Sequence, residues 1–167
     1  MQVLKFGGSS LADAANMLKA ADIIARAVDR DRTIVIASAI YKCTDTLIQI
    51  GNLAAAHDSS YTELLDELQQ KHHRLIKELL PMEKHEESTE VCDETFASIH
   101  GIIKGVYLLG ELSTFSLDAI QGCGELLSSR ILATKMASVG IPTKWVDSRD
   151  IIRTRLISGR EVVDNAV

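Results

Sequence analysis

The first 37 residues alternate between two short apolar runs and one helical pattern, and this order restricts the possible folds more than any other feature of the sequence. Residues 3–6 form an apolar run interrupted by one lysine, and residues 33–37 form a continuous β-branched run, typical of a strand covered on both faces. From residue 11 to residue 28, apolar side chains recur at spacings of three and four, as on one face of a helix. Strand, helix and strand in this order predict a parallel crossover and an α/β fold.

The remainder of the chain reads mostly as helix. Apolar periodicity and capping signals predict a largely parallel sheet sandwiched between helices, with two helices inserted between the second and third strands. The expected helices cover residues 44–57, 61–80, 88–109 and 114–139, a third strand covers 143–146, and a further extended piece covers 151–154.

Composition limits the function classes. A hydrophobic content of 46% and a charged content of 25% indicate one globular domain, and the net charge of −5 argues against a general nucleic-acid binder. No apolar run reaches the roughly 20 residues of a membrane span, and the start lacks a signal-peptide layout. Cys43, Cys92 and Cys123 lie far apart, so we expect reduced thiols and a cytoplasmic protein with no membrane partner.

The stretch from Lys5 to Ser10, Lys-Phe-Gly-Gly-Ser-Ser, joins the first strand to the first helix. Glycine backbone can approach a phosphate closely, and the first N–H groups of a helix have no intrahelical partner. Lys5 adds a cation, Ser10 can cap the helix, and Asp13 places an acid in its first turn. The sequence therefore predicts a phosphate-binding turn, although a plain connection would use the same residues.

Three segments are expected to converge at the carboxyl edge of the sheet, where open α/β sheets bind ligands. They are the loops at residues 5–10, 38–44 and 122–129, which together hold two lysines (Lys5 and Lys42), several hydroxyls and one carboxylate, Glu125. Neither a nucleophile–base set nor a metal motif is present, so no metal ligands are assigned. We interpret His72 and His73 as part of a solvated helix face rather than as a metal pair.

The residues in these segments resemble the aspartate kinases. Residues 5–10 match the family's Lys-Phe-Gly-Gly-[Ser/Thr]-Ser signature, and residues 124–129 resemble its Gly-Glu-x-x-Ser motif. Ser38-Ala39 with Thr44-Asp45 resembles the second loop, and residues 147–154 resemble the segment after the third strand. The resemblance implies an amino-acid-kinase fold and transfer of the ATP γ-phosphoryl group to the β-carboxylate of L-aspartate, which opens lysine, threonine and methionine biosynthesis.

The resemblance also implies roles for individual residues. Lys5 would stabilise the transferred phosphoryl group, aided by Mg²⁺, and the acceptor carboxylate would need no general base because it is already ionised at pH 7. The phosphates would contact Lys5, Gly7, Gly8 and Ser9, the substrate carboxylates would contact Ser38 and Thr44, and the ammonium group would contact Glu125. Residues 40–43 depart from the smaller residues common in the family.

Several of these residues also have structural interpretations. Glu125 could be a first-turn helix acid, Ser128 and Ser129 are expected to serve mainly in helix packing, and Cys123 is expected to be a small buried filler. Lys42 is expected to point into solvent.

Family motifs expected after the fourth match do not occur within residues 1–167. We therefore expect residues 1–167 to form the amino-acid-binding N-terminal part of a kinase domain, incomplete at its C-terminal end, without the nucleotide lobe and regulatory modules. On this reading the isolated chain is inactive, and the full-length enzyme is a homo-oligomer, either monofunctional or fused to a homoserine dehydrogenase.

Three alternatives stay open. They are another amino-acid kinase of the glutamate or acetylglutamate type, a non-catalytic binding or regulatory subunit with the same fold, and a dinucleotide-binding oxidoreductase. The third is disfavoured because the spacing of Gly7 and Gly8 does not fit GxGxxG.

Overall fold

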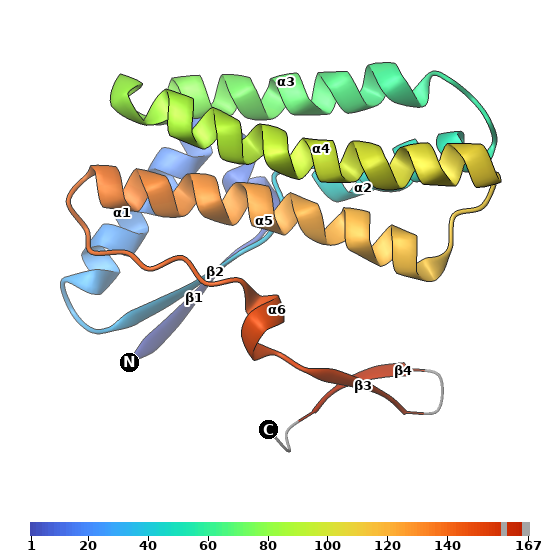
Figure 1. Ribbon diagram of the computed structural model, residues 1–167. Coiled ribbons are helices and arrows are strands. Elements are labelled where there is room, and N and C mark those ends of the chain that lie inside the picture. The colour runs from blue at the N-terminus through green and yellow to red at the C-terminus, as the bar shows by residue number, and fades with distance from the viewer. Residues whose placement is uncertain (158–159, 165–167) are drawn as a thin grey trace.

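The computed structural model describes residues 1–157 and 160–164 (Figure 1). A small sheet and a layer of long helices make up most of it, and a hairpin follows at the C-terminal end. In chain order the elements are β1 (Gln2–Phe6), the 3₁₀ turn η1 (Gly8–Leu11), α1 (Ala14–Val28), β2 (Thr33–Ala37), α2 (Cys43–Ala55), α3 (Tyr61–Leu79), the 3₁₀ turn η2 (Met82–Lys84), α4 (His85–Leu109), α5 (Thr114–Ser138), α6 (Ser148–Ile151), β3 (Thr154–Ile157) and β4 (Arg160–Val163).

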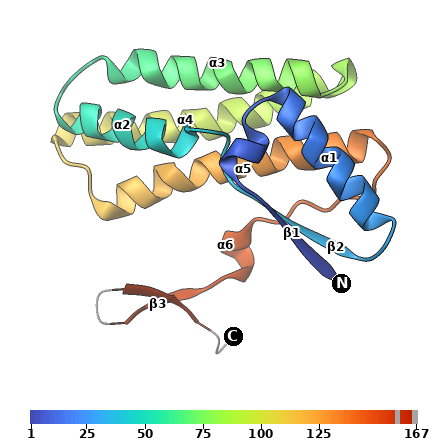
Figure 2. The ribbon, with the colours of Figure 1, turned by 180° about the vertical axis from the view of Figure 1, so that it is seen from behind.

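Strands β1 and β2 pair in parallel, in register from Gln2 opposite Thr33 to Phe6 opposite Ala37. Helix α1 connects them and crosses the sheet, as the view from behind shows (Figure 2). The predicted strand–helix–strand unit and the α/β fold class are confirmed. The carboxyl ends of both strands therefore lie at one edge, where the first and second loops begin.

The first helix begins later than predicted. Instead of starting at Leu11 with Ser10 as its cap, the chain makes the turn η1, and α1 starts at Ala14. Asp13 is the N-cap, and its carboxylate accepts a hydrogen bond from the Asn16 backbone N–H at 2.8 Å. The negative charge and the hydrogen bond of this carboxylate at the helix N-terminus make that terminus less suited to a phosphate.

The four helices α2 to α5 form the main hydrophobic core. They lie beside one another in Figure 1, and each presents an apolar stripe to the others, which confirms the predicted helical periodicity. Predicted and observed boundaries agree within three residues for all four helices. The largest fully buried side chains of this layer include Leu47, Ile50, Leu65, Ile76, Phe96, Ile99, Ile103 and Ile120.

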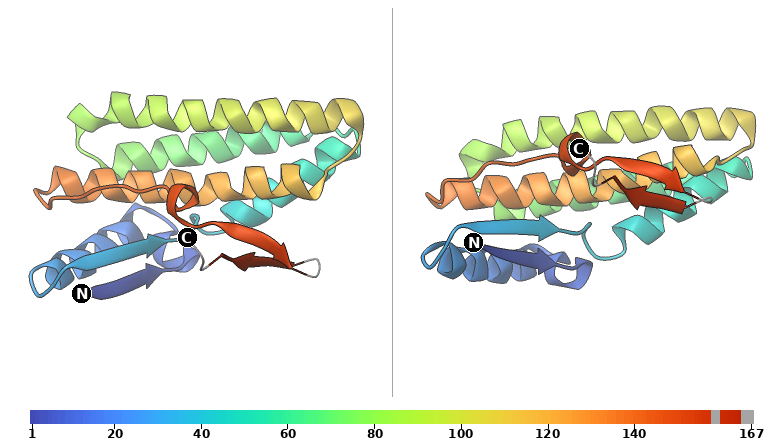
Figure 3. Two further views of the ribbon diagram at one scale, coloured as in Figure 1. Left: turned by 60° about the horizontal axis from the view of Figure 1, so that its bottom comes forward. Right: turned by 90° about the horizontal axis from the view of Figure 1, so that it is seen from below.

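One face of the β1–β2 sheet is open, contrary to the expectation that residues 33–37 are covered on both faces. In the view from below, no described helix lies over this face (Figure 3). Val3, Ile34 and Ile36 are 56%, 48% and 49% exposed there. The continuous β-branched run correctly indicates a strand, but coverage of its second face depends on contacts that residues 1–157 and 160–164 do not make.

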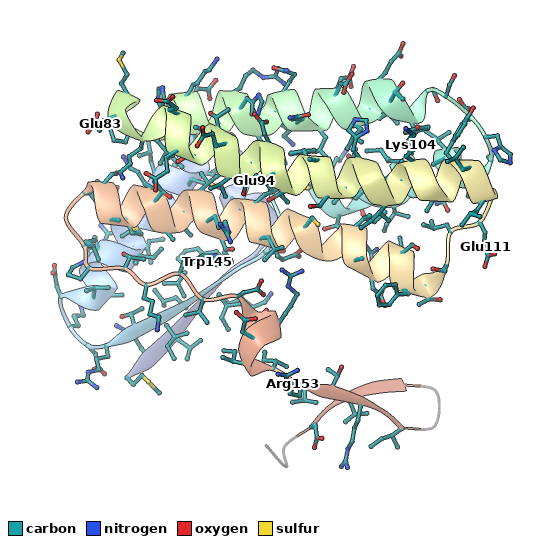
Figure 4. The ribbon with its side chains drawn as sticks, viewed as in Figure 1. Glu83, Glu94, Lys104, Glu111, Trp145 and Arg153 are labelled. Atoms are coloured by element: carbon teal, nitrogen blue, oxygen red, sulfur yellow. The ribbon has the colours of Figure 1, made fainter. Side chains whose placement is uncertain are left out.

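The predicted third strand, residues 143–146, is extended but makes no ladder within the described residues. Trp145 attaches this segment to α5 (Figure 4). Its indole N–H donates to Ser129 Oγ at 3.0 Å, and the Arg130 guanidinium lies 4.0 Å from the centroid of its ring. Residue 151 ends the short helix α6, Ile152 has extended dihedral angles and β3 starts at Thr154, so the predicted extended piece at 151–154 is confirmed except at its first residue. Strands β3 and β4 form an antiparallel hairpin that projects away from the helices in Figure 1.

Among the described residues, no helix has the length and apolarity that crossing a membrane requires.

His72 is buried in the helical layer, so its interpretation as part of a solvated face is wrong. Its side chain is 0% exposed, its Nδ1 lies 2.8 Å from the Leu68 carbonyl oxygen, and its ring packs edge-on against Phe96. Nε2 is buried and has no hydrogen-bond partner among residues 1–157 and 160–164. Burial disfavours the charged imidazolium and lowers the pKa of His72 from 6.5 to about 4.

The buried histidine makes stability depend on pH. His72 becomes protonated near pH 6.5 in the unfolded chain but only near pH 4 in the folded chain. The contribution of neutral His72 to the free energy of unfolding is therefore fully present above pH 6.5 and falls as the pH drops towards 4. The loss amounts to about 3 kcal/mol. In urea unfolding between pH 7 and pH 4.5, the free energy of unfolding should fall less steeply for His72→Leu than for the parent. It should fall as steeply as in the parent for His100→Gln, at an exposed position of α4. Parallel declines for all three proteins would contradict this account.

Candidate active site

The first loop leaves β1 at the carboxyl edge of the sheet. Lys5 is the penultimate residue of β1, is exposed, and lies opposite Ile36 on the open face. Ser9 is exposed in the turn η1, and a side-chain carbon added at Gly7 would meet no atom within 4 Å. The backbone around Gly7 is therefore accessible to a ligand from solvent.

Gly8 brings the first loop against the second. A Cβ atom at Gly8 would lie 3.1 Å from the Ala39 carbonyl oxygen and 3.6 Å from Tyr41 Cα. The Ser38 backbone N–H also donates to the Phe6 carbonyl oxygen at 3.0 Å. The glycine therefore allows close approach of two backbones, a role that sequence reasoning did not assign to it beside phosphate contact or a plain connection.

The second loop ends in a left-handed residue and is held from α3. Lys42 has a φ of 63° and precedes Cys43, the first residue of α2, while Thr44 is half-buried in the first turn. The ammonium group of Lys71 donates to the Tyr41 carbonyl oxygen at 3.0 Å. Lys42 itself is exposed, as predicted. Sequence reasoning missed Lys71, because no local pattern signals a contact across 30 residues.

The third segment is part of the helix predicted over residues 114–139 and is not a loop. Residues 122–129 lie in the middle of α5, so Glu125 is not a first-turn acid and the helix dipole does not explain it. Gly124 faces the second loop, since a Cβ there would lie 2.9 Å from Ala39 Cβ and 3.2 Å from Cys43 Sγ. Ser128 Oγ donates to the Ser38 carbonyl oxygen at 2.7 Å. The helix is thereby locked to the loop, and half-buried Glu125 follows the contact residue directly.

Charged groups gather around this junction. Burial raises the pKa of the Cys43 thiol to about 12, with the Glu125 carboxylate adding to the rise and the Lys71 ammonium opposing it. Burial also raises the pKa of Cys123, and the Arg149 guanidinium opposes that shift. Cys43 and Cys123 are both buried, as expected for Cys123, and these shifts keep both thiols protonated at neutral pH.

Asp147 and Arg149 form an ion pair just after the segment 143–146. Arg149 Nη2 donates to Asp147 Oδ2 at 2.6 Å, and this contact holds the pKa of Asp147 below its usual range. The Asp147 carboxylate also accepts from the Arg149 backbone N–H, so it caps α6. Asp147 is thus already paired with Arg149, whereas Glu125 takes part in no ion pair among the described residues.

The structure brings most of the predicted site residues to one edge. Ser38 and Thr44 lie at the two ends of the second loop, and Glu125 lies beside that loop on α5. Lys5 belongs to the same edge but extends from the open face of the sheet, and no direct contact joins it to Glu125 among the described residues. The site is therefore a set of three adjoining segments open to solvent.

The described surface also has two hollows. One, of about 180 Å³, is between α4 and α5 and includes Cys92, Arg130 and Trp145. The other, of about 400 Å³, lies between β2, α5 and residues 141–146. Apolar side chains dominate both linings, so neither matches the charged groups expected around a small dicarboxylic amino acid.

Comparison with known proteins points to one family. Residues 1–166 match the amino acid kinase family. The chain is 29% identical over 150 residues to the bifunctional aspartokinase/homoserine dehydrogenase 1 of Zea mays, covering 90% of this chain and 16% of that protein. It is 31% identical over 151 residues to aspartokinase 3 of Arabidopsis thaliana, covering 89% of this chain and 26% of that protein.

Solved structures show the same fold. Aspartokinase III of E. coli, in complex with lysine and aspartate, superposes with a TM-score of 0.84 at 23% identity, over 98% of this chain and 35% of that one. Its complex with aspartate and ADP gives a TM-score of 0.81 at 24% identity, with the same coverage. The chain thus spans about a sixth to a quarter of the two plant relatives and about a third of the solved enzyme.

Two glycines of α5 provide a matched test of the helix–loop contact. Gly124→Ala should destabilise the fold by roughly 1–3 kcal/mol, because the new methyl group overlaps Ala39 and Cys43. Gly122→Ala should instead stabilise it by about 0.5–1 kcal/mol, because space is open there and alanine favours the helix. Denaturant unfolding of both variants checks the pair, and equal effects would contradict the contact.

Proposed function

Because the chain belongs to the amino acid kinase family, we propose that residues 1–167 form the amino-acid-binding part of an aspartate kinase. The reaction is transfer of the ATP γ-phosphoryl group to the β-carboxylate of L-aspartate. The observation that carries the proposal is the junction of three segments at Gly8, Ala39 and Gly124, which gathers a lysine loop, a hydroxyl loop and a carboxylate. Residues 5–10, 38–45 and 124–129 supply these groups.

The named relatives support the choice of substrate. The plant proteins are named aspartokinases, and the two E. coli structures are named as complexes with aspartate, one of them also with ADP. A glutamate or acetylglutamate kinase would share the fold but would need room for a longer side chain or for an acyl group.

The amino-acid side of the site is assigned to α5 and the second loop. Glu125 receives the ammonium group of aspartate, because it is half-buried beside the loop and lies on the helix that Gly124 brings close. Ser38, directly after β2, and Thr44, in the first turn of α2, hold carboxylate oxygens through their hydroxyl groups. Lys71, on α3, is a positioning residue, because its ammonium group donates to the Tyr41 carbonyl oxygen of the second loop.

The phosphate side is assigned to the first loop. Lys5 neutralises charge as two anions approach each other, and Gly7, Gly8 and Ser9 supply backbone and hydroxyl donors. The open space at Gly7 fits close approach of a phosphate. The aspartate side chain, with a pKa of about 3.9, is ionised at pH 7, so the chain needs to position and neutralise charge rather than remove a proton.

Mg²⁺ is expected to accompany ATP. When bound, it would neutralise charge on the phosphates. Asp147 is paired with Arg149 and Glu125 is assigned to the ammonium group, so the proposal assigns the ion no ligand from the described residues.

We place the adenine-binding groups and any regulatory modules outside residues 1–167, and we expect a homo-oligomer in full-length relatives. A cytoplasmic, reducing compartment fits Cys43, Cys92 and Cys123, all of which are free.

The assignment of Glu125 can be tested with two ligands that differ by one group. Succinate is aspartate without the ammonium group, so Glu125→Gln should weaken L-aspartate binding roughly 10- to 100-fold and leave succinate binding nearly unchanged. Isothermal titration of the 167-residue chain measures both. Glu111→Gln, at an exposed position on the turn between α4 and α5 (Figure 4), is the matched control and should change neither affinity.

Equal losses for aspartate and succinate would contradict the assignment of Glu125. Tighter binding of L-glutamate than of L-aspartate would instead favour the glutamate-type alternative.

Turnover of residues 1–167 alone is expected to be negligible. With Mg-ATP and L-aspartate, hydroxylamine should trap no more aspartyl phosphate from the parent chain than from Lys5→Met. Trapped product that Lys5→Met abolishes would show that these residues are a complete catalyst, contrary to the proposal.

A further inference from the structure

A nitrogen, a sulfur and an oxygen donor meet between α3 and α4, outside the candidate active site. His73 belongs to α3, and Cys92 and Asp93 belong to α4. One ring nitrogen, the thiol sulfur and one carboxylate oxygen of these residues all lie within 4.8 Å of one another. The two helices lie side by side in Figure 1, so the cluster bridges two rigid elements.

The cluster is arranged by contacts across the helix interface. His73 Nε2 lies 2.6 Å from Asp93 Oδ1, and the Gln69 amide, one turn earlier on α3, donates to the same oxygen at 2.7 Å. Asp93 is thereby oriented from two positions on the facing helix. Oriented ligands are what a metal site requires, because disordered side chains would have to be fixed on binding.

Burial and access also suit an ion. The Cys92 side chain is 2% exposed and forms the inner wall, while the side chains of His73 and Asp93 are 17% and 47% exposed. His73 and Asp93 thus form the solvent-facing side of the cluster, and Cys92 forms its buried side. A water molecule can take the remaining position on the solvent side.

The donor types select the class of ion. Thiolate, imidazole and carboxylate together are ligands of Zn²⁺ and similar borderline-soft cations, whereas Mg²⁺ and Ca²⁺ take oxygen ligands almost exclusively. A tetrahedral zinc with bonds of about 2.0–2.1 Å separates nitrogen and oxygen ligands by roughly 3.3 Å. The direct contact between His73 and Asp93 would thus open by about 0.7 Å. The Cys92 sulfur, which lies within 4.8 Å of both partners, would approach to about 3.6 Å of each of them.

We propose that His73, Cys92 and Asp93 form a binding site for Zn²⁺ or a similar divalent cation, with water as the fourth ligand. Binding converts the Cys92 thiol to a metal-bound thiolate and releases one proton to the buffer. The bound ion joins α3 to α4 within the helical layer. Because these residues take no part in the proposed phosphoryl transfer, the test of the cation site does not depend on that function.

The test uses untagged, chelator-treated 167-residue chain titrated with Zn²⁺ and with Co²⁺. We expect one ion per chain, a proton release visible as buffer-dependent heat, and a sulfur-to-cobalt charge-transfer band. Cys92→Ser should abolish that band and weaken Zn²⁺ binding at least 10-fold, and His73→Gln should weaken binding 10- to 100-fold. A hundredfold excess of Zn²⁺ over Kd should raise the Tm of the parent by roughly 5–10 °C.

The control variants are Cys123→Ser and His100→Gln, which change the same residue types outside the cluster and should bind like the parent. If Cys92→Ser folds poorly, the cobalt spectrum of His73→Gln still decides, because that ligand is half-buried and its loss leaves no cavity in the core. Absence of stoichiometric binding, or binding that Cys123→Ser weakens as much as Cys92→Ser, would overturn the proposal. The cluster would then be a hydrogen-bonded contact between helices.

Discussion

The close approach of α5 to the loop after β2 is the contact on which the rest of the candidate site depends. Gly124 allows it, because any side chain at that position would overlap Ala39 and Cys43. Ser128 then fixes it with a hydrogen bond to the Ser38 carbonyl oxygen. Without this contact, Glu125 would be one acid in the middle of a long helix, with no relation to the sheet edge. With it, residues 86 positions apart, Ala39 and Glu125, become neighbours of one site.

The same principle operates at Gly8, where two backbones meet instead of a helix and a loop. The two glycines have different surroundings but the same effect, since each removes a side chain where two segments must touch. Charged side chains from neighbouring elements then approach these contacts. Lys71 reaches the second loop from α3, and Arg149 approaches Cys123 from the C-terminal side. An acidic chain with a net charge of −5 can in this way present local cations to an anionic ligand.

Local patterns predicted the elements well and their contacts poorly. Periodicity identified the βαβ unit and the four long helices, because an apolar stripe is a local property of the sequence. It did not distinguish Ser10 from Asp13 as the helix cap, since both are good caps and only the turn η1 decides between them. His72 was misjudged because its charged neighbours suggested a solvated face, although the residue lies on the apolar stripe of α3. Residues 143–146 have strand propensity, but no neighbouring strand pairs with them in the described part of the chain.

The candidate site was partly predictable for a related reason. The motif residues could be named from their resemblance to a family, but Lys71 and the role of Gly8 in packing needed coordinates, because their partners are distant or on another segment. Amide chemical shifts of the ¹⁵N-labelled chain during titration with L-aspartate test the central claim most directly. We predict that the largest changes fall on Gly8, on residues 38–44 and on residues 124–128 together. Changes confined to the hollow between α4 and α5, or to one of the three segments, would contradict a single site built at their junction.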